Sequence, residues 1–151
     1  MFTNYHMKTL SCSVLVFLCG LASLRTGETN DLDSMQGSWL VVSLIEKGKA
    51  VPGGELETLE IVIDKDTFTT FEKGKVVVKY RIKLEPTKSP KQIDLTYLVG
   101  EDKGKTEPGI YTFAKDQLKV CLDEDKKGRP MVFEGKETQS YSVIVLKKKP
   151  K

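Results

Sequence analysis

The chain has 151 residues, enough for one domain with a substantial hydrophobic core. Its 24 basic and 21 acidic residues nearly balance, so the net charge of +3 gives no support to nucleic-acid binding. The lysines of the C-terminal LKKKPK more than supply this excess. We expect residues 148–151 to form a short solvated basic tail, with contact to a membrane surface or a polyanion as the alternative.

The N-terminal segment has the layout of a secretory signal peptide. Lys8 is followed by an apolar run from Leu10 to Leu24, and small residues stand at the −3 and −1 positions of a cleavage after Ala22. We therefore assign residues 1–22 to a signal peptide and predict an exported protein, either periplasmic or secreted.

The apolar run is about 15 residues long, whereas a membrane-spanning helix needs ~20. We therefore expect no stable membrane span after cleavage, with an uncleaved signal anchor as the alternative. Both Met1 and Met7 are candidate starts of translation. Residues 23–35, which follow the cleavage site, are predicted to be a polar lead-in.

Removal of the signal leaves a single cysteine, Cys121, and no histidine. This composition excludes an intramolecular disulfide, a Ser-His-Asp triad, a Cys-His pair and a zinc site with the usual ligands. Cys121 lies in the apolar stretch QLKVCLDE and is predicted to be a small buried side chain. Because no arrangement of carboxylates, lysines or tyrosines stands out, we predict a protein that is not an enzyme and carries no metal or cofactor.

After the lead-in, runs rich in Val, Ile, Tyr, Phe and Thr recur at short intervals, separated by Gly, Pro, Lys and Asp. This spacing is typical of an antiparallel barrel or sandwich. VPGGELETL, at 51–59, is expected to hold one helical turn, and MVFEG, at 131–135, is a candidate edge segment. The eight predicted strands are 37–46, 59–64, 67–73, 75–84, 92–98, 109–114, 117–123 and 139–147.

The fourth of these strands, KVVVKYRIKLE, shows the clearest alternation. Apolar residues occupy every second position and basic residues most of the others, which indicates one dry and one wet face. The dry face is predicted to comprise Val76, Val78, Tyr80, Ile82 and Leu84. EKGK at 72–75 and AKDQ at 114–117 are short enough for hairpins, so the flanking strands should be antiparallel.

The first strand opens with SMQGSWLVV, in which Gly37 precedes Trp39 by two positions. A Gly-x-Trp at this point resembles the opening motif of the lipocalins, whose tryptophan closes the base of an eight-stranded up-and-down barrel. In lipocalins an arginine stacks on that tryptophan, and the resemblance makes Arg129 the candidate here.

A wider pattern, comprising LDSMQGSWLVVSLIEKGKAVP, PKQIDLTYLVGEDKGKTEPGIYTF, DQLKVCL and GRPMVF, resembles an uncharacterised lipocalin-like domain common in exported planctomycete proteins. The resemblance covers about residues 33–147. It implies an all-β lipocalin-like barrel at 36–147 in a bacterial exported protein. It implies no known activity.

Two segments echo functional motifs without meeting their requirements. GEDKGKT, at 100–106, has three residues between Gly100 and Gly104 where a phosphate-binding loop needs four. DEDKKGRPMVFE, at 123–134, has Lys127 where a calcium loop requires an oxygen ligand. We therefore interpret both as polar turns or loops.

A closed barrel of eight strands can be filled by side chains or can hold one small ligand. We predict a monomer that binds a small apolar or amphipathic molecule inside the barrel. The alternative is a packed barrel that acts through its surface as a structural or interaction domain of the cell envelope. The predicted lining residues are Val76, Val78, Tyr80, Ile82, Ile93, Leu95 and Tyr97.

Two points of orientation concern the neighbouring strands. Asp94 interrupts an apolar strand and is predicted to point outward, either solvated or paired with a lysine. In the strand at 109–114, the inward pair is either Ile110 with Thr112 or Tyr111 with Phe113, and the sequence favours neither.

Overall fold

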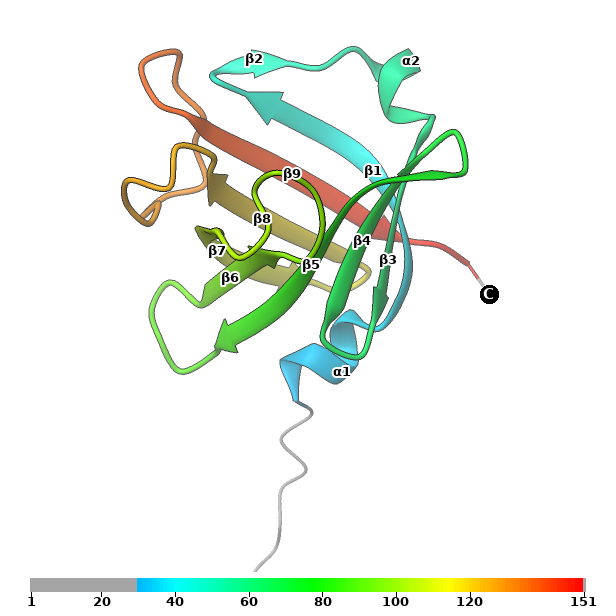
Figure 1. Cartoon of the computed structure of the whole chain (residues 1–151), viewed down its shortest axis with the longest axis horizontal. Coiled ribbons are helices and arrows are strands. Elements are labelled where there is room, and N and C mark those ends of the chain that lie inside the picture. The colour runs from blue at the N-terminus through cyan, green and yellow to red at the C-terminus, as the bar shows by residue number, and fades with distance from the viewer. Residues whose placement is uncertain (1–29, 151) are drawn as a thin grey trace, which may run out of the picture.

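The alternating segments form one antiparallel sheet that closes on itself. The computed structural model describes residues 30–150, and within that range the chain is nearly all β (Figure 1). The short helices are α1 (Asp31–Met35) and α2 (Gly53–Leu56). The strands are β1 (Gly37–Glu46), β2 (Lys49–Ala50), β3 (Leu59–Asp64), β4 (Thr67–Glu72), β5 (Lys75–Glu85), β6 (Gln92–Tyr97), β7 (Thr106–Ala114), β8 (Gln117–Asp123) and β9 (Tyr141–Lys148).

Closure of the barrel comes from the pairing of β1 with β9. The other neighbours follow chain order, and every pairing is antiparallel. Strand β2 only extends the end of β1, through Ile45–Ala50 and Glu46–Lys49. Without β2, the wall has eight strands, so the predicted eight-stranded up-and-down barrel is confirmed.

Apart from shifts of one or two residues at strand ends and the short β2, which was not predicted, the observed elements differ from the predicted ones in three places. Strand β7 begins at Thr106 rather than at residue 109, because Pro108 pairs with Asp94 without interrupting the sheet. Strand β8 pairs with β7 only from Gly109 onward, so the missing N–H of Pro108 is not needed on that side. Residues 131–135 form no strand, and α1 occupies the end of the predicted polar lead-in.

The hairpin predicted at 72–75 is confirmed. Lys73 (φ 49°) and Gly74 (φ 77°) form a two-residue turn with positive φ at both positions, the geometry that suits the right-handed twist of the flanking strands. Lys47 and Gly48 make the same kind of turn between β1 and β2. Gly48 also packs tightly, since a Cβ there would lie 2.6 Å from a backbone nitrogen of the 124–140 loop.

One end of the barrel is closed by α1 and Trp39. The Trp39 side chain is 1% exposed, and its Nε1 donates a hydrogen bond to the carbonyl of Met35 over 2.8 Å. At the other end of α1, Asp31 accepts hydrogen bonds from the Lys91 amino group (2.7 Å) and the Tyr111 hydroxyl (2.6 Å). The helix is therefore fastened at both ends, and the base of the barrel is sealed.

The cation over the Trp39 ring is Lys148, at the end of β9. Its Nζ lies 5.2 Å from the ring centroid and donates to the Ser34 carbonyl over 3.1 Å. The next residue, Lys149, donates its backbone N–H to the Ser38 carbonyl. Lys148 belongs to β9 and is held against the barrel wall, so it is not part of the predicted solvated tail at 148–151, whereas Lys149 is exposed and its Nζ lies 3.1 Å from the Glu60 carboxylate.

The predicted stacking of Arg129 on Trp39 is wrong. The Arg129 guanidinium donates to the carbonyls of Ile93 (3.0 Å) and Gly109 (2.6 Å) and pairs with the Asp94 carboxylate (2.6 Å). Arg129 lies in the loop after β8, which covers the outside of β6 and β7, whereas β9 brings Lys148 to the base. Asp94 points away from the core as predicted, but its partner is an arginine rather than a lysine.

Two hydrophobic clusters lie on opposite sides of β7 and β8. Tyr111 and Phe113 belong with the barrel interior, which settles the inward face of β7. Ile110, Cys121 and Val143 form a smaller outer cluster, buried by the 124–140 loop, of which Phe133 is part. Cys121 is buried as predicted, and burial raises the pKa of its thiol to about 11.

Asp123 organises the start of the same loop. Its carboxylate accepts hydrogen bonds from the backbone N–H groups of Asp125 (3.1 Å), Lys127 (2.7 Å) and Gly128 (2.7 Å). Asp123 stands at the first position of the segment that resembles a calcium loop. Its carboxylate oxygens are therefore occupied by backbone N–H groups of the loop that follows it. In residues 30–150 no group of three or more His, Cys, Asp or Glu side chains is placed to hold a metal ion.

Candidate functional site

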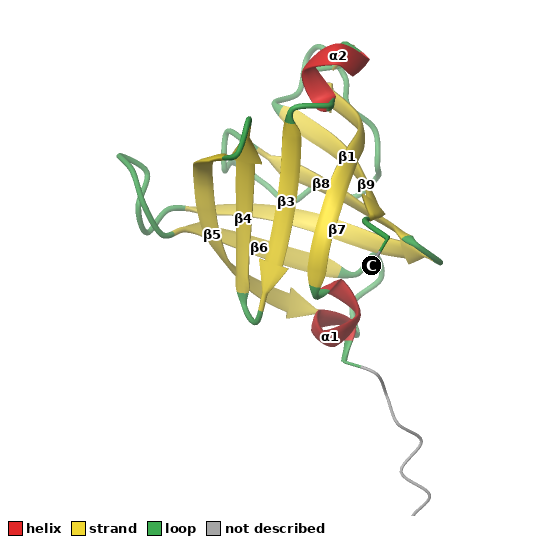
Figure 2. Ribbon diagram, turned by 90° about the vertical axis from the view of Figure 1, so that its right-hand side faces the viewer, coloured by secondary structure: helices red, strands yellow, loops and turns green. Residues whose placement is uncertain are grey.

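The end of the barrel opposite α1 carries a cleft between its strand ends. Figure 2 shows α1 and α2 at opposite ends of the wall. The cleft at the α2 end has a volume of about 400 Å³, and we call it the mouth cleft. Its charged lining residues are Glu46, Asp102, Glu107, Glu124 and Lys126, and the others are Leu44, Tyr80, Tyr97, Leu122, Ser142 and Ile144.

Beneath the mouth cleft lies a smaller cavity of about 100 Å³, here called the apolar cavity. Tyr80, Leu44, Leu122 and Ile144 line both spaces, so the two are adjacent. A cavity of about 150 Å³ accommodates benzene, so this one has room for a group of a few carbons. The remaining lining residues of the apolar cavity are Val41, Leu59, Ile61, Phe68, Thr70 and Leu95.

Glu107 is the buried acid of the mouth cleft. Alternation along β7 places it on the same inward face as Tyr111, opposite Leu95 of β6, and it is only 4% exposed. Its Oε1 accepts a hydrogen bond from the Tyr97 hydroxyl. Burial raises the pKa of the Glu107 carboxyl above its ordinary value, although the hydrogen bond from Tyr97 and the charge of Lys126 act in the opposite direction.

Two tyrosines stand beside this acid. The ring centroids of Tyr80 and Tyr97 are 4.6 Å apart. Burial, together with the interaction with Glu107, raises the pKa of Tyr97 to about 12, and burial raises that of Tyr80 as well. Both hydroxyls are therefore protonated at neutral pH, and that of Tyr97 donates its proton to the Glu107 carboxylate. The Lys126 amino group lies 5.4 Å from the Tyr97 ring centroid and 3.6 Å from Oδ2 of Asp102.

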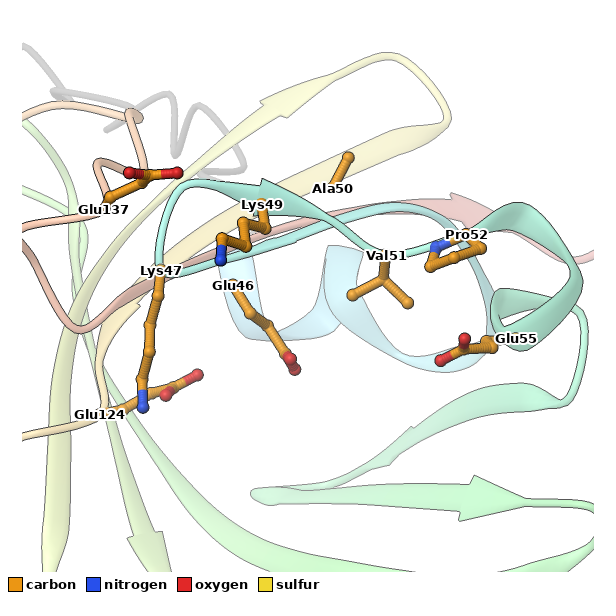
Figure 3. Close-up of a pocket in the computed structure, with 9 residues that line it drawn as sticks. All are labelled: Glu46, Lys47, Lys49, Ala50, Val51, Pro52, Glu55, Glu124 and Glu137. Atoms are coloured by element: carbon orange, nitrogen blue, oxygen red, sulfur yellow. The ribbon is translucent and has the colours of Figure 1, made fainter.

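Glu124 continues the inward alternation of β8 beyond Leu122. Burial raises its pKa, the charge of Glu46 raises it further, and the charge of Lys47 lowers it. Glu46 and Glu124 also line a neighbouring outer cleft of about 650 Å³ beside the β1–β2 turn and α2. Figure 3 shows its lining, with the Lys47 amino group near the Glu124 carboxylate and Glu55 at the far side.

The predicted lining residues separate by depth in the barrel. Tyr80 lines both spaces, Leu95 lines the apolar cavity, and Tyr97 lines the mouth cleft. Ile82 and Ile93 are buried in the packed core, and Val78 is half-buried against it. Only part of the predicted lining therefore meets at the candidate site.

Val76 is not a lining residue, and its prediction is wrong. It is 54% exposed and lies outside the core. The register between β4 and β5 shifts between Thr70 and Phe71, so that Thr70 faces Val78 while Phe71 faces Val76. This irregularity breaks the alternation and turns the start of β5 to solvent.

Sequence reasoning missed the acids of the mouth cleft. Glu107 lies ahead of the predicted strand, which starts at residue 109, whereas β7 begins at Thr106. A strand beginning earlier would have placed Glu107, Gly109 and Tyr111 on one face. Glu124 lies two positions after Leu122, which faces the barrel interior. Strand alternation of period two was therefore the only feature of the sequence that indicated an inward-facing Glu124 side chain.

The closed eight-stranded antiparallel wall, with a sealed base and a cleft at the opposite end, fits a lipocalin-like fold. No family model matches this chain, and comparisons with curated proteins and with solved structures find no match. The planctomycete family suggested by the sequence motifs therefore stays a prediction. Among the described residues, no helix has the length and apolar character needed to cross a membrane.

Proposed function

We propose that this chain is a binding protein that holds a small amphipathic molecule at the mouth of the barrel. The observation that carries the proposal is the apolar cavity directly beneath a polar cleft, with Tyr80 lining both. The apolar part of a ligand would enter the cavity and leave water there. Its polar part would meet the Tyr97 hydroxyl and the Glu107 carboxylate.

The packing below the cavity limits the ligand to a short apolar group. Ile82 is 5% exposed, Ile93 1% and Trp39 1%, and all three belong to the continuous core that fills the lower barrel. A long acyl chain has no path through such a core. A group of a few carbons fits the volume of about 100 Å³.

Several further parts of the proposal rest on the sequence. The signal pattern of residues 1–22 supports export to the periplasm or beyond, and it lies outside the described residues. The absence of a histidine after residue 22 supports binding rather than catalysis. The near balance of charges supports a protein that does not bind nucleic acid. The quoted motifs support membership of the planctomycete lipocalin-like family, and the monomeric state is part of the same proposal.

A packed barrel that acts through its surface is the second candidate, and one observation favours it. Most of the interior is filled, with Leu95, Leu118 and Leu146 each fully buried. In that case the cavity is only a packing defect, and the protein works as an interaction domain of the envelope without a ligand.

Titration with 1-butanol, followed by amide NMR spectra of the protein, separates these two functions. Binding predicts saturable shifts confined to residues around the mouth cleft and the apolar cavity. Ile144→Trp, which fills the cavity, should abolish them, whereas Val77→Trp on the outer wall should not, since Val77 is 57% exposed. If Ile144→Trp does not fold, Leu44→Phe serves the same purpose.

An absence of saturable shifts would refute ligand binding and leave the packed barrel. Native mass spectrometry of the exported protein, with a denatured control, would reveal a natural ligand as an extra mass lost on denaturation. That mass would identify the compound class directly.

A further inference from the structure

The charge at the mouth of the barrel is opposite in sign to that of the whole chain. The chain carries a net charge of +3, whereas the mouth cleft is lined by four acidic side chains and one basic one. The single base of the lining, Lys126, lies 3.6 Å from Asp102, which also pairs with Lys105 over 2.6 Å, so the other three acids of the lining outnumber the one lysine that enters the cleft. A cleft lined by one sign of charge between low-dielectric walls attracts ligands of the opposite sign.

Three acids of the cleft, Glu46, Glu107 and Glu124, have no basic group within 4.0 Å among the described residues. Glu107 matters most because it is 4% exposed. A buried carboxylate is costly unless a charge partner and hydrogen bonds satisfy it. The hydroxyl of Tyr97 donates a hydrogen bond to Glu107 but carries no charge, and the positive charge of Lys126 acts on that carboxylate only from beyond 4.0 Å.

The tyrosines of the cleft suit a cation in a second way. Aromatic faces attract ammonium groups, and Lys126 already holds its amino group 5.4 Å from the Tyr97 ring centroid. The chain therefore places one ammonium group of its own in this cleft, between an aromatic ring and a carboxylate. Tyr80, whose ring centroid is 4.6 Å from that of Tyr97, extends the aromatic surface down to the apolar cavity.

We infer that the ligand of the mouth cleft is a small organic cation, a protonated amine joined to a short apolar group. The inference rests on the proposed binding function and adds the charge of the ligand. The ammonium group, with three N–H donors, binds the Glu107 carboxylate against the tyrosine rings. The short apolar group occupies the cavity of about 100 Å³ below. A carboxylate ligand would instead bring a second negative charge beside Glu107.

Three probes with the same four-carbon chain test the charge: 1-butylammonium, 1-butanol and butyrate. Dissociation constants are measured on the whole protein by amide NMR titration at neutral pH and constant ionic strength. We expect butylammonium to bind at least about 10-fold more tightly than butanol, and butyrate to bind most weakly. Added NaCl should weaken the binding of butylammonium more than that of butanol.

Glu107→Gln should bring the affinity for butylammonium close to that for butanol and leave butanol binding within about twofold. Asp64→Asn is the matched control, because this exposed acid ends β3 away from the mouth cleft and should leave both affinities unchanged. If Glu107→Gln does not fold, Glu124→Gln should reduce the preference for the cation in the same direction.

The outcomes separate this inference from the proposed function. Butanol binding as tightly as butylammonium, or butyrate binding more tightly, would overturn the inferred charge while leaving ligand binding intact. An unchanged preference for the cation in Glu107→Gln would remove Glu107 as its anchor. Failure of all three probes to give saturable shifts would refute both the binding function and the inference that depends on it.

Discussion

Replacement of Trp39 by alanine should destabilise the barrel more than most single changes, because this side chain seals the base. A buried tryptophan removes about 150–250 Å² from water, which corresponds to roughly 4–6 kcal/mol at ~25 cal/mol per Å². The change also removes the hydrogen bond from Nε1 to Met35 and the contact with the Lys148 ammonium. Partial collapse of the cavity offsets some of the loss, so we expect about 3–5 kcal/mol.

The assay is urea denaturation followed by far-UV circular dichroism, because the variant lacks the chain's only tryptophan as a fluorescence probe. Trp39→Phe provides a graded comparison, since it keeps an aromatic ring but leaves the Met35 carbonyl without its donor. We expect it to lose about 1–3 kcal/mol. Val77→Ala, at a site 57% exposed, should change the free energy of unfolding by less than ~0.5 kcal/mol.

A loss of less than about 1 kcal/mol in Trp39→Ala would refute this account of the base. It would mean that α1 and the surrounding strands hold the lower barrel closed without the indole. An unfolded variant, by contrast, would show that the whole barrel depends on this closure, and Trp39→Phe would then give the measurable cost.

Three further predictions concern other parts of the wall. Arg129→Ala should lower the free energy of unfolding by about 1–3 kcal/mol in urea titrations, because it leaves Asp94 without its ion pair, and Arg129→Lys should recover only part of this loss. Gly109→Ala should destabilise by at least about 1–3 kcal/mol in the same assay, since its Cβ would lie 2.5 Å from the Cys121 carbonyl oxygen. Burial raises the pKa of Glu107 in the folded state, so its contribution to stability is fully present below the ordinary value of 4.5 and is lost as the pH rises through the raised pKa. Thermal unfolding at a series of pH values should show a smaller fall in stability over that window for Glu107→Gln than for the wild type, and identical slopes would contradict the assignment.

The strands could be predicted from the sequence because period-two alternation is a local property. The alternation at Tyr80 and Ile82, for example, follows directly from half of a strand facing the core. The helix α1 has only five residues, too few for a periodic signal, and its position depends on Asp31 meeting Tyr111 across the barrel. Local patterns also gave no warning of the register shift that exposes Val76.

The candidate site was harder to predict because its residues converge only through closure of the barrel. Glu107 and Glu124 lie on different strands, and neither belongs to a recognisable motif. The cation that contacts Trp39 likewise depends on tertiary structure. Arg129 lies in the 124–140 loop and binds the outside of β6 and β7, so the contact with Trp39 is made by Lys148 instead. Such choices follow from tertiary packing between distant segments, which alternation within one strand does not encode.

The two ends of the described chain leave the barrel at the sealed end. Strand β9 ends at Lys148, whose amino group reaches the Ser34 carbonyl, and α1 begins the described chain beside it (Figures 1 and 2). A tether, purification tag or fused domain joined directly at residue 30 or residue 150 is therefore attached at the pole opposite the cleft. Immobilised through residue 30 or residue 150, the barrel would present its cleft to the solution, so surface-based binding assays can capture it at either of these ends without blocking access.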